Sequence, residues 1–271
     1  MVVMDIVSHQ HALAPAVRNF AVFTEANSAH RQTMEDTHRT EPHLMPGVAF
    51  FAVFDGHGGA EAADCASENM HKHLAARLGT SSPDSVQKRI CDCYLDTDKT
   101  IKDAGIQVAG CTVATALVLT EDGQRMLYAA NAGDSRVVLM RGGQAIRLTV
   151  DHNPALRSEY ERITGAGGCV AFNRVNGILA VSRSLGDHMM KELVVANPEI
   201  SRAALCPLDH FLIIACDGLW DVVEDQEACD FVSQMATHVP TASISDICTA
   251  LGRLALTKGS RDNITIVLVW L

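Results

Sequence analysis

The chain has 271 residues, 48% of them hydrophobic, and a formal net charge of −10 at pH 7. This length suits one large domain with a substantial core. The acidic balance argues against nucleic acid as a partner, because no stripe of Lys and Arg is present to contact phosphates. The longest apolar runs are about seven or eight residues, far short of the ~20 that a membrane helix needs, so we expect no membrane span.

The sequence carries no recognisable targeting signal. The N-terminus lacks a basic segment followed by an apolar one, and residue 2 is Val, so we expect neither a signal peptide nor myristoylation. The nine cysteines are an odd number and form no C-x-x-C pair, which is typical of reduced thiols in a reducing compartment. We therefore expect a cytoplasmic or nuclear protein, and we expect it to be a monomer.

The first part of the chain is predicted to contain strands and then two helices. Residues 1–17 show no clear period and are expected to form a flexible arm, before a single domain over 18–271. A short strand is predicted over 20–23, a polar stretch over 25–41 and a strand over 48–54. Helical spacing then predicts helices over 58–78 and 86–104, which the short loop between them would pack antiparallel.

The rest of the chain is predicted to be mainly strands. Turn residues predict a meander with strands over 112–119, 126–130, 135–140 and 144–148. A helix over 153–164 and a glycine-rich bend come next, and further strands are expected over 178–182, 193–195, 199–204 and 210–216. Helices over 225–237 and 243–257 precede a last strand over 263–270. Because the helices come in pairs and do not alternate with strands, the order predicts an α+β fold, a central antiparallel β-sandwich flanked by pairs of antiparallel helices.

Carboxylates recur where the predicted apolar strands end. Phe54 runs into Asp55-Gly56 and Cys216 into Asp217-Gly218, whereas Asp262 opens the last strand. The whole set is Glu35, Asp36, Asp55, Asp134, Asp187, Asp217 and Asp262. Each residue alone can be an ordinary turn Asp, but strand ends are where functional loops gather. Carboxylates crowd together only where a charge cancels their repulsion, and for oxygen ligands that charge is usually a hard divalent cation.

Such a cluster can carry out hydrolysis. Two cations bridged by one carboxylate and a water would lower the pKa of that water and aim a hydroxide at phosphorus or carbonyl carbon. Asp55 is the preferred bridge, since Gly56 lets its own carbonyl approach a metal closely. Arg31 matches a phosphate bidentately, or else forms a surface ion pair with Glu35 or Asp36. His57 can be a general acid, a metal ligand or a cap for the following helix.

The motifs, in this order, resemble the metal-dependent protein serine/threonine phosphatases of the protein phosphatase 2C family. The matching segments are 31–36, 54–59, 110–112, 131–136, 148–152, 179–187, 215–221 and 260–265. They span nearly the whole chain, and eight motifs in the same order are a far more specific signal than one.

The resemblance implies a protein phosphatase with two Mg²⁺ or Mn²⁺ ions in a cleft at one end of the sandwich. In the family's arrangement Asp55 would bridge the metals and the Gly56 carbonyl would complete one shell. The remaining implied ligands are Asp187, Asp217 and Asp262 for one metal, Glu35 and Asp36 for the other, and Asp134 with Asp187 for a weaker third.

The resemblance also implies the roles of three residues around the metals. Arg31 would hold the phosphate of a phosphoprotein substrate, and His57 would be the general acid toward the leaving serine or threonine oxygen. Thr112 occupies the family's conformationally sensitive position near the metals.

Two departures from the family pattern bear on specificity and regulation. Only ten residues separate Asp187 from Pro198, where many relatives have a longer flap, so we expect a more open cleft and broad specificity. Cys111 replaces the more usual Ser, and it is either a redox-sensitive thiol near the cleft or a packed, inert one.

Two other functions compete with the active phosphatase. A catalytically silent pseudophosphatase acting as a binding module predicts lost metal ligands, but every mapped ligand side chain is a carboxylate. A hydrolase of small phosphate esters or nucleotides would want a G-x-x-x-x-G-K-[ST] loop for a nucleotide, and none is present.

Overall fold

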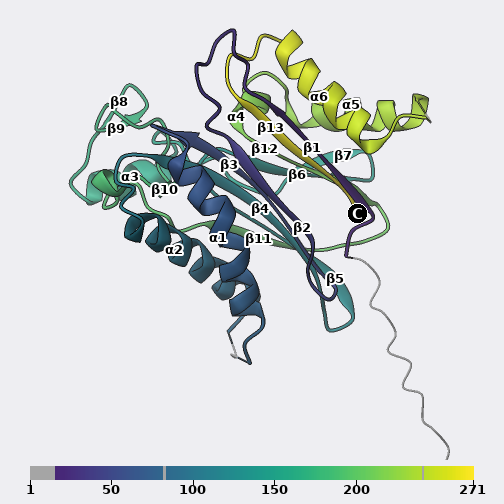
Figure 1. Ribbon diagram of the computed structural model, residues 1–271, viewed down its shortest axis with the longest axis horizontal. Coiled ribbons are helices and arrows are strands. Elements are labelled where there is room, and N and C mark those ends of the chain that lie inside the picture. Colours follow the sequence, from purple (N-terminus) through teal and green to yellow (C-terminus); the bar gives the residue numbers. More distant parts are fainter. Residues whose placement is uncertain (1–15, 82–83, 240) are drawn as a thin grey trace, which may run out of the picture.

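The computed structural model describes residues 16–81, 84–239 and 241–271. Two antiparallel sheets pack face to face, and a pair of helices covers the outer face of each (Figure 1). One sheet has the order β1 (Asn19–Glu25), β13 (Ile264–Trp270), β12 (Asp209–Ala215), β6 (Arg136–Arg141) and β7 (Gln144–Arg147). The other has the order β11 (Glu199–Ala204), β5 (Gln124–Ala132), β4 (Gly110–Glu121), β3 (Val48–His57) and β2 (Thr37–Met45), and β10 (Leu185–Gly186) pairs with the start of β4.

The central strands are apolar on both faces because both faces are covered. In β3, Phe51 and Val53 pack between the sheets, whereas Phe50, Ala52 and Phe54 face the helices. A strand buried on both sides therefore reads as a continuous apolar run rather than as an alternation. This accounts for the uninterrupted runs that the sequence shows in β3, β12 and β13.

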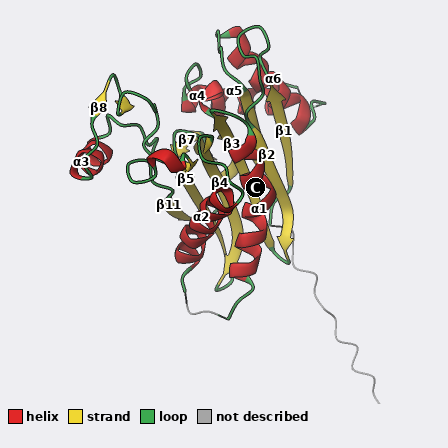
Figure 2. Ribbon diagram, turned by 60° about the vertical axis from the view of Figure 1, so that its left-hand side comes forward, coloured by secondary structure: helices red, strands yellow, loops and turns green. Residues whose placement is uncertain are grey.

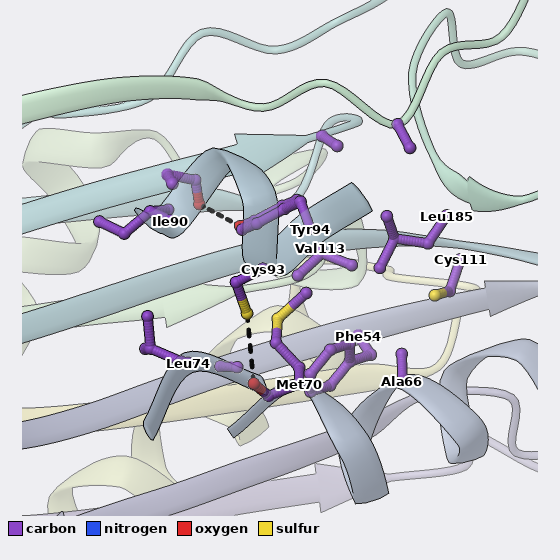
Figure 3. Close-up of a cluster of buried hydrophobic side chains, with 14 of the residues drawn as sticks. Phe54, Ala66, Met70, Leu74, Ile90, Cys93, Tyr94, Cys111, Val113 and Leu185 are labelled. Atoms are coloured by element: carbon purple, nitrogen blue, oxygen red, sulfur yellow. Dashed lines mark hydrogen bonds between the residues drawn. The ribbon is translucent and has the colours of Figure 1, made fainter. Parts of the chain in front are cut away.

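The helix pair α1 (Glu61–Leu78) and α2 (Val86–Asp103) covers the second sheet. Met70 and Leu74 of α1 and Tyr94 of α2 pack in one buried cluster with Phe54 and Val113 (Figure 3). The Tyr94 hydroxyl donates to the Ala130 carbonyl at 3.0 Å, so its one polar atom is satisfied inside the core.

The other pair, α5 (Asp225–His238) and α6 (Ile244–Thr257), covers the first sheet. A capping box between Ser243 and Asp246 fixes the start of α6. Its buried residues, Ile247 and Leu251 among them, fall at helical spacing and pack on that sheet.

A small lobe stands off from the two sheets at one end of the sandwich (Figures 1 and 2). We use the name "lobe" for residues 157–184 and 187–195, on either side of β10, which belongs to the sheet; they include α3 (Arg157–Gly165), β8 (Val170–Ala171), β9 (Arg174–Val175) and the 3-10 helix His188–Met190. It has its own small core of Ile163, Val175 and Val194. The buried Glu159 carboxylate accepts hydrogen bonds from Arg162 at 2.8 Å and Arg183 at 2.6 Å, which ties α3 to the chain leading into β10.

The structure confirms the α+β sandwich with its two helix pairs, and it corrects three details. Neither residues 178–182 nor residues 193–195 form a strand: each segment contributes one bridge, between Leu179 and Val175 and between Val195 and Arg183. The polar stretch predicted over 25–41 ends in an edge strand, β2, whose half-buried side chains give no apolar signal. The predicted arm lies outside the described residues at 1–15, but Ala16 and Val17 are buried between the sheets.

Among the described helices, none has both the length and the apolar character that a membrane span requires.

Candidate active site

A cavity of about 860 Å³ lies at the end of the sandwich that carries the lobe. Ten of the residues selected from the sequence line it: Arg31, Glu35, Asp55, Gly56, His57, Thr112, Asp134, Asp187, Asp217 and Asp262. Asp36 is buried beside the cluster, with only 8% of its surface exposed.

Strand pairing brings these residues together. In the antiparallel register of β3 and β4, Asp55 lies opposite Thr112. β12 runs antiparallel to β13, so Asp217, just after the end of β12, lies at the same sheet end as Asp262, just before the start of β13. The Thr112 Oγ1 lies 2.6 Å from the Ser135 Oγ, which links β4 to the loop that carries Asp134.

Two groups of potential ligand atoms form at this end of the sandwich. Carboxylate oxygens of Asp55, Asp134 and Asp217 lie within 4.8 Å of one another, and so do ligand atoms of Asp36, Asp55 and Cys216. Burial, reinforced by the neighbouring carboxylates, raises the pKa of Asp55 and of Asp217 well above its usual value. Burial is also the largest cause that raises the pKa of Asp36 and of Asp134 to about 6. Asp55 belongs to both groups, as a bridging ligand should.

A divalent cation fits this arrangement. The Asp217 Oδ1 is buried and has no hydrogen-bond partner among the described residues, so one strong acceptor is left free toward the cluster. A buried polar atom in that state is costly unless something binds it. The three crowded carboxylates supply the oxygen donors that hard cations prefer.

Cys216 is not part of the donor set, although it lies beside it. Its thiol donates to Asp36 Oδ2 at 3.2 Å, and its sulfur accepts from the Thr265 amide at 3.2 Å. Burial raises the pKa of this thiol well above its usual value, so it stays protonated.

The Glu35 backbone bonds to β3, and both oxygens of the Glu35 carboxylate also accept hydrogen bonds. The Gly56 amide donates to the Glu35 carbonyl at 3.2 Å, and a Cβ at Gly56 would overlap that carbonyl oxygen. The Glu35 carboxylate accepts from the Thr33 hydroxyl at 2.8 Å and from the Gly59 amide at 3.2 Å. Gly56 is therefore required for the close approach of the loop that carries Glu35. This requirement does not depend on what the Gly56 carbonyl binds.

Arg31 has a different partner from the one expected for a surface ion pair. Its guanidinium contacts the Asp262 carboxylate rather than Glu35 or Asp36, and half of its side chain, 51%, is exposed to the cavity side or solvent. The Asp262–Asn263 turn also anchors the loop that carries Arg31. Asn263 donates to the carbonyls of Ala26 and Thr33 at 2.8 and 3.0 Å and accepts from the Glu35 amide at 2.9 Å.

His57 is paired with Asp187. Its Nε2 lies 2.8 Å from Asp187 Oδ2, which also accepts a hydrogen bond from the Ser184 hydroxyl. A Cβ at Gly110 would overlap both the His57 ring and the Asp187 carboxylate, so only glycine permits the pair. The hypothesis that His57 caps the next helix is wrong, because α1 begins after Ala60 and has no side-chain cap. Neither close group of ligand atoms includes His57 or Asp187.

Sequence reasoning missed three contributors to the site. Asp221 lies one helical turn after Asp217, and its charge helps to raise the pKa of both Asp134 and Asp217. The Asp-x-x-x-Asp spacing was the available signal. Asn263 was quoted only as part of a motif, and Arg174 of the lobe also lines the cavity without any signal in the sequence.

The structure bears on two sequence hypotheses, the open cleft and the reactivity of Cys111. Residues of the lobe line one side of the cavity, so the short segment before Pro198 does not leave that side open; they are Arg174, residues 178–181, Asp187, Met189 and Met190. Cys111 is fully buried in the cluster of Figure 3, and burial raises the pKa of its thiol well above its usual value. The packed, inert alternative therefore holds for Cys111.

A buried carboxylate cluster that fits a divalent cation, with an arginine and a histidine at its edge, defines a metal-dependent hydrolase of phosphate esters. The family model "Protein phosphatase 2C" matches residues 20–264. The chain is 37% identical over 260 residues to Protein phosphatase 2C homolog 1 of Saccharomyces cerevisiae, covering 90% of each protein. It is 40% identical over 251 residues to Protein phosphatase 2C homolog 1 of Schizosaccharomyces pombe, covering 90% of this chain and 71% of that protein.

A solved structure agrees with this fold. The serine-threonine phosphatase 2C from Toxoplasma gondii superposes with a TM-score of 0.80 at 24% identity, covering 95% of this chain and 98% of that one. The chain belongs to the protein phosphatase 2C family and is a metal-dependent protein serine/threonine phosphatase.

Proposed function

We propose that this phosphatase removes phosphate from phosphoserine and phosphothreonine in proteins with two Mg²⁺ or Mn²⁺ ions and without a covalent phosphoenzyme. The observation that carries the proposal is the meeting, in one cavity, of the crowded Asp55, Asp134 and Asp217 carboxylates with Arg31 and His57. Cytoplasmic or nuclear location and a monomeric state remain predictions from the sequence.

The ligands fall into two sets around Asp55. Asp217 and Asp262 come from neighbouring strand ends on one side, and Glu35 with Asp36 come from the loop packed against Gly56 on the other. A third ion at Asp134 and Asp187 stays a prediction: the Asp134 carboxylate lies near those of Asp55 and Asp217, whereas the Asp187 carboxylate contacts His57. Divalent cations held by these carboxylates would supply hydroxide from water for direct attack on phosphorus.

The protein's own side chains position the substrate and donate a proton to its leaving group. Arg31 is exposed at the cavity and is held near the cluster by Asp262, where its fork can bind the oxygens of a phosphate. His57 is positioned by Asp187 and can give a proton to the alkoxide that leaves as serine or threonine. The two cysteines nearest the cluster, Cys111 and Cys216, are buried and protonated, so neither is a nucleophile.

The test is phosphate release from a phosphothreonine peptide with Mn²⁺, with Mg²⁺ and with EDTA, for the wild type and for Asp217→Asn. We expect turnover with either cation, none with EDTA and none in the variant. Asp103→Asn is a matched control, because its carboxylate lies on the exposed end of α2 and pairs only with Lys99 among the described residues. Folded wild-type protein that binds Mn²⁺ but releases no phosphate would instead support the pseudophosphatase.

A further inference from the structure

Large apolar side chains lie exposed around the active-site cavity. Val108, Ile178 and Met189 line it and are 71%, 63% and 76% exposed. Single exposed apolar residues are normal on a protein surface, but several that line one cavity indicate a binding surface. Two of them belong to the lobe, and Val108 belongs to the loop before β4.

A fourth apolar residue, Phe172, stands at the tip of the β8–β9 hairpin. It is 97% exposed, and its φ of 52° is left-handed, as is the φ of 57° at Asn173. Such a two-residue turn favours Asn or Gly, and a bulky side chain with positive φ is an outlier. Phe172 gains no burial in this chain that would offset its unfavourable backbone, which points to a contact with a partner.

The lobe holds these side chains in a preformed arrangement. Arg162, held by Glu159, donates to the carbonyls of Ser182 and Leu193 at 2.8 and 2.7 Å. Arg174 donates to the Ile178 carbonyl at 2.6 Å, which fixes the loop that presents Ile178. A surface that is already ordered loses little conformational entropy when it binds a ligand.

We propose that Val108, Ile178 and Met189 form a subsite for a large apolar side chain next to the phosphorylated residue of the substrate. This rests on the proposed function, because the phosphate must sit at the carboxylate cluster and Arg31 of the same cavity. One residue of an extended peptide spans only about 3.3 Å, so the immediate neighbours of the phosphoresidue reach the other residues that line this cavity. Phe172 is not among the residues that line the cavity, but it stands on the same lobe, two residues before Arg174, which does line it.

The same wall selects against basic neighbours. Arg174 lines the cavity beside Ile178, and its guanidinium would repel a Lys or Arg side chain placed in the subsite. Specificity of this kind uses a repulsive group together with an attractive surface.

The experiment compares phosphothreonine peptides that differ only at the two positions flanking the phosphothreonine, occupied by Leu, Ser or Lys. We expect kcat/KM of the wild type to be about 10-fold higher for the Leu peptide than for the Ser peptide, and lowest for the Lys peptide. The double variant Val108→Ser with Ile178→Ser, and separately Met189→Ser, should bring the Leu and Ser peptides to within about 2-fold. Hydrolysis of p-nitrophenyl phosphate should stay within about 2-fold of wild type, because so small a substrate does not reach the subsite.

Leu208→Ser is the matched control, since Leu208 is 58% exposed and lies in the turn before β12, away from the residues that line the cavity. The subsite is wrong if the wild type does not distinguish the Leu and Ser peptides, or if the rim variants keep the wild-type preference. Wild-type protein that hydrolyses neither peptides nor p-nitrophenyl phosphate would contradict the proposed function instead. In that case, direct binding of the Leu and Ser peptides to the wild type would still decide on the subsite.

Discussion

The two walls of the active-site cavity are built in different ways. The wall from the sandwich consists of carboxylates at strand ends, and the register of β3 with β4 and of β12 with β13 fixes their places. The wall from the lobe is largely apolar, comes from loops with little regular structure, and is held by arginine bonds to Glu159 and to backbone carbonyls. Under the two proposals above, the sandwich wall would carry the chemistry and the lobe wall would contribute to the choice of substrate.

The walls also differ in their effect on stability. On the sandwich wall, like charges are buried together and raise one another's pKa, so this end of the protein is destabilised until a cation binds. On the lobe wall the exposed apolar residues carry no such electrostatic cost. Changes on the sandwich wall should therefore affect activity and metal-free stability in opposite directions.

The largest expected effect is that of Asp55→Asn. Loss of the shared ligand should lower phosphate release roughly a thousandfold or more, since the cations supply both the nucleophile and charge neutralisation. In EDTA the same variant should melt about 3 °C or more above the wild type, because a buried like charge is removed. Phosphate release measures the loss of activity, and thermal unfolding in EDTA measures the gain in stability. A variant that melts lower than wild type in EDTA would show that the crowded carboxylates are not a source of instability.

His57→Gln should have the next largest effect, and the size of the loss in turnover should depend on the leaving group of the substrate. Loss of a general acid costs about 100-fold or more when the leaving group is an alkoxide that needs a proton. p-Nitrophenolate leaves without protonation, so turnover of p-nitrophenyl phosphate should fall far less. Equal losses on a phosphothreonine peptide and on p-nitrophenyl phosphate would assign His57 to metal or phosphate binding instead.

Gly110→Ala breaks the junction between the walls, because Gly110 lies in β4 beside His57 and opposite β10 of the lobe side. The added methyl group would overlap the His57 ring and the Asp187 carboxylate and force them apart. We expect about a 10-fold loss of phosphothreonine turnover with a smaller loss for p-nitrophenyl phosphate, from displacement of the acid by about 1 Å. Gly165→Ala is the control, since a methyl group there meets open space. Wild-type turnover in Gly110→Ala would rule out a tight requirement for the pair.

The smallest effect is a pH dependence of metal-free stability. The pKa of Asp134 and of Asp36 rises from 3.8 to about 6 on folding, so the folded state holds more protons between these pH values. Their contribution to stability is present below pH 4 and is lost as the pH rises through about 6. The wild type should thus lose this contribution between pH 4 and 6.5, whereas Asp134→Asn has none to lose at position 134. In EDTA, the change in melting temperature from pH 4 to 6.5 should be about 3 °C less positive in the wild type than in Asp134→Asn.

Thermal unfolding of both proteins across this pH range gives the difference directly. His152, whose pKa burial lowers to about 4, has the opposite pH dependence but is present in both proteins and cancels. Parallel curves for wild type and variant would mean that folding does not raise the pKa of Asp134.

Most of the sandwich could be predicted from the sequence because its signals are local. Apolar runs marked β3, β12 and β13, helical spacing marked both helix pairs, and Asp-Gly pairs marked the strand ends where the carboxylates gather. The edge strand β2 escaped prediction because its side chains are half-buried and polar. The short apolar run 178–181 predicts a strand, but it forms only one bridge, between Leu179 and Val175, and it lines the cavity.

By itself, the sequence determined the layered fold, the set of carboxylates and the family, because strand ends and short motifs consist of consecutive residues. The tertiary structure alone decided the partners. It placed Arg31 on Asp262, His57 on Asp187, and Ile178 and Met189 around the cavity with Val108. These contacts join residues far apart in the chain, or depend on which way a loop is held, and neither the spacing nor the composition of a segment records that information.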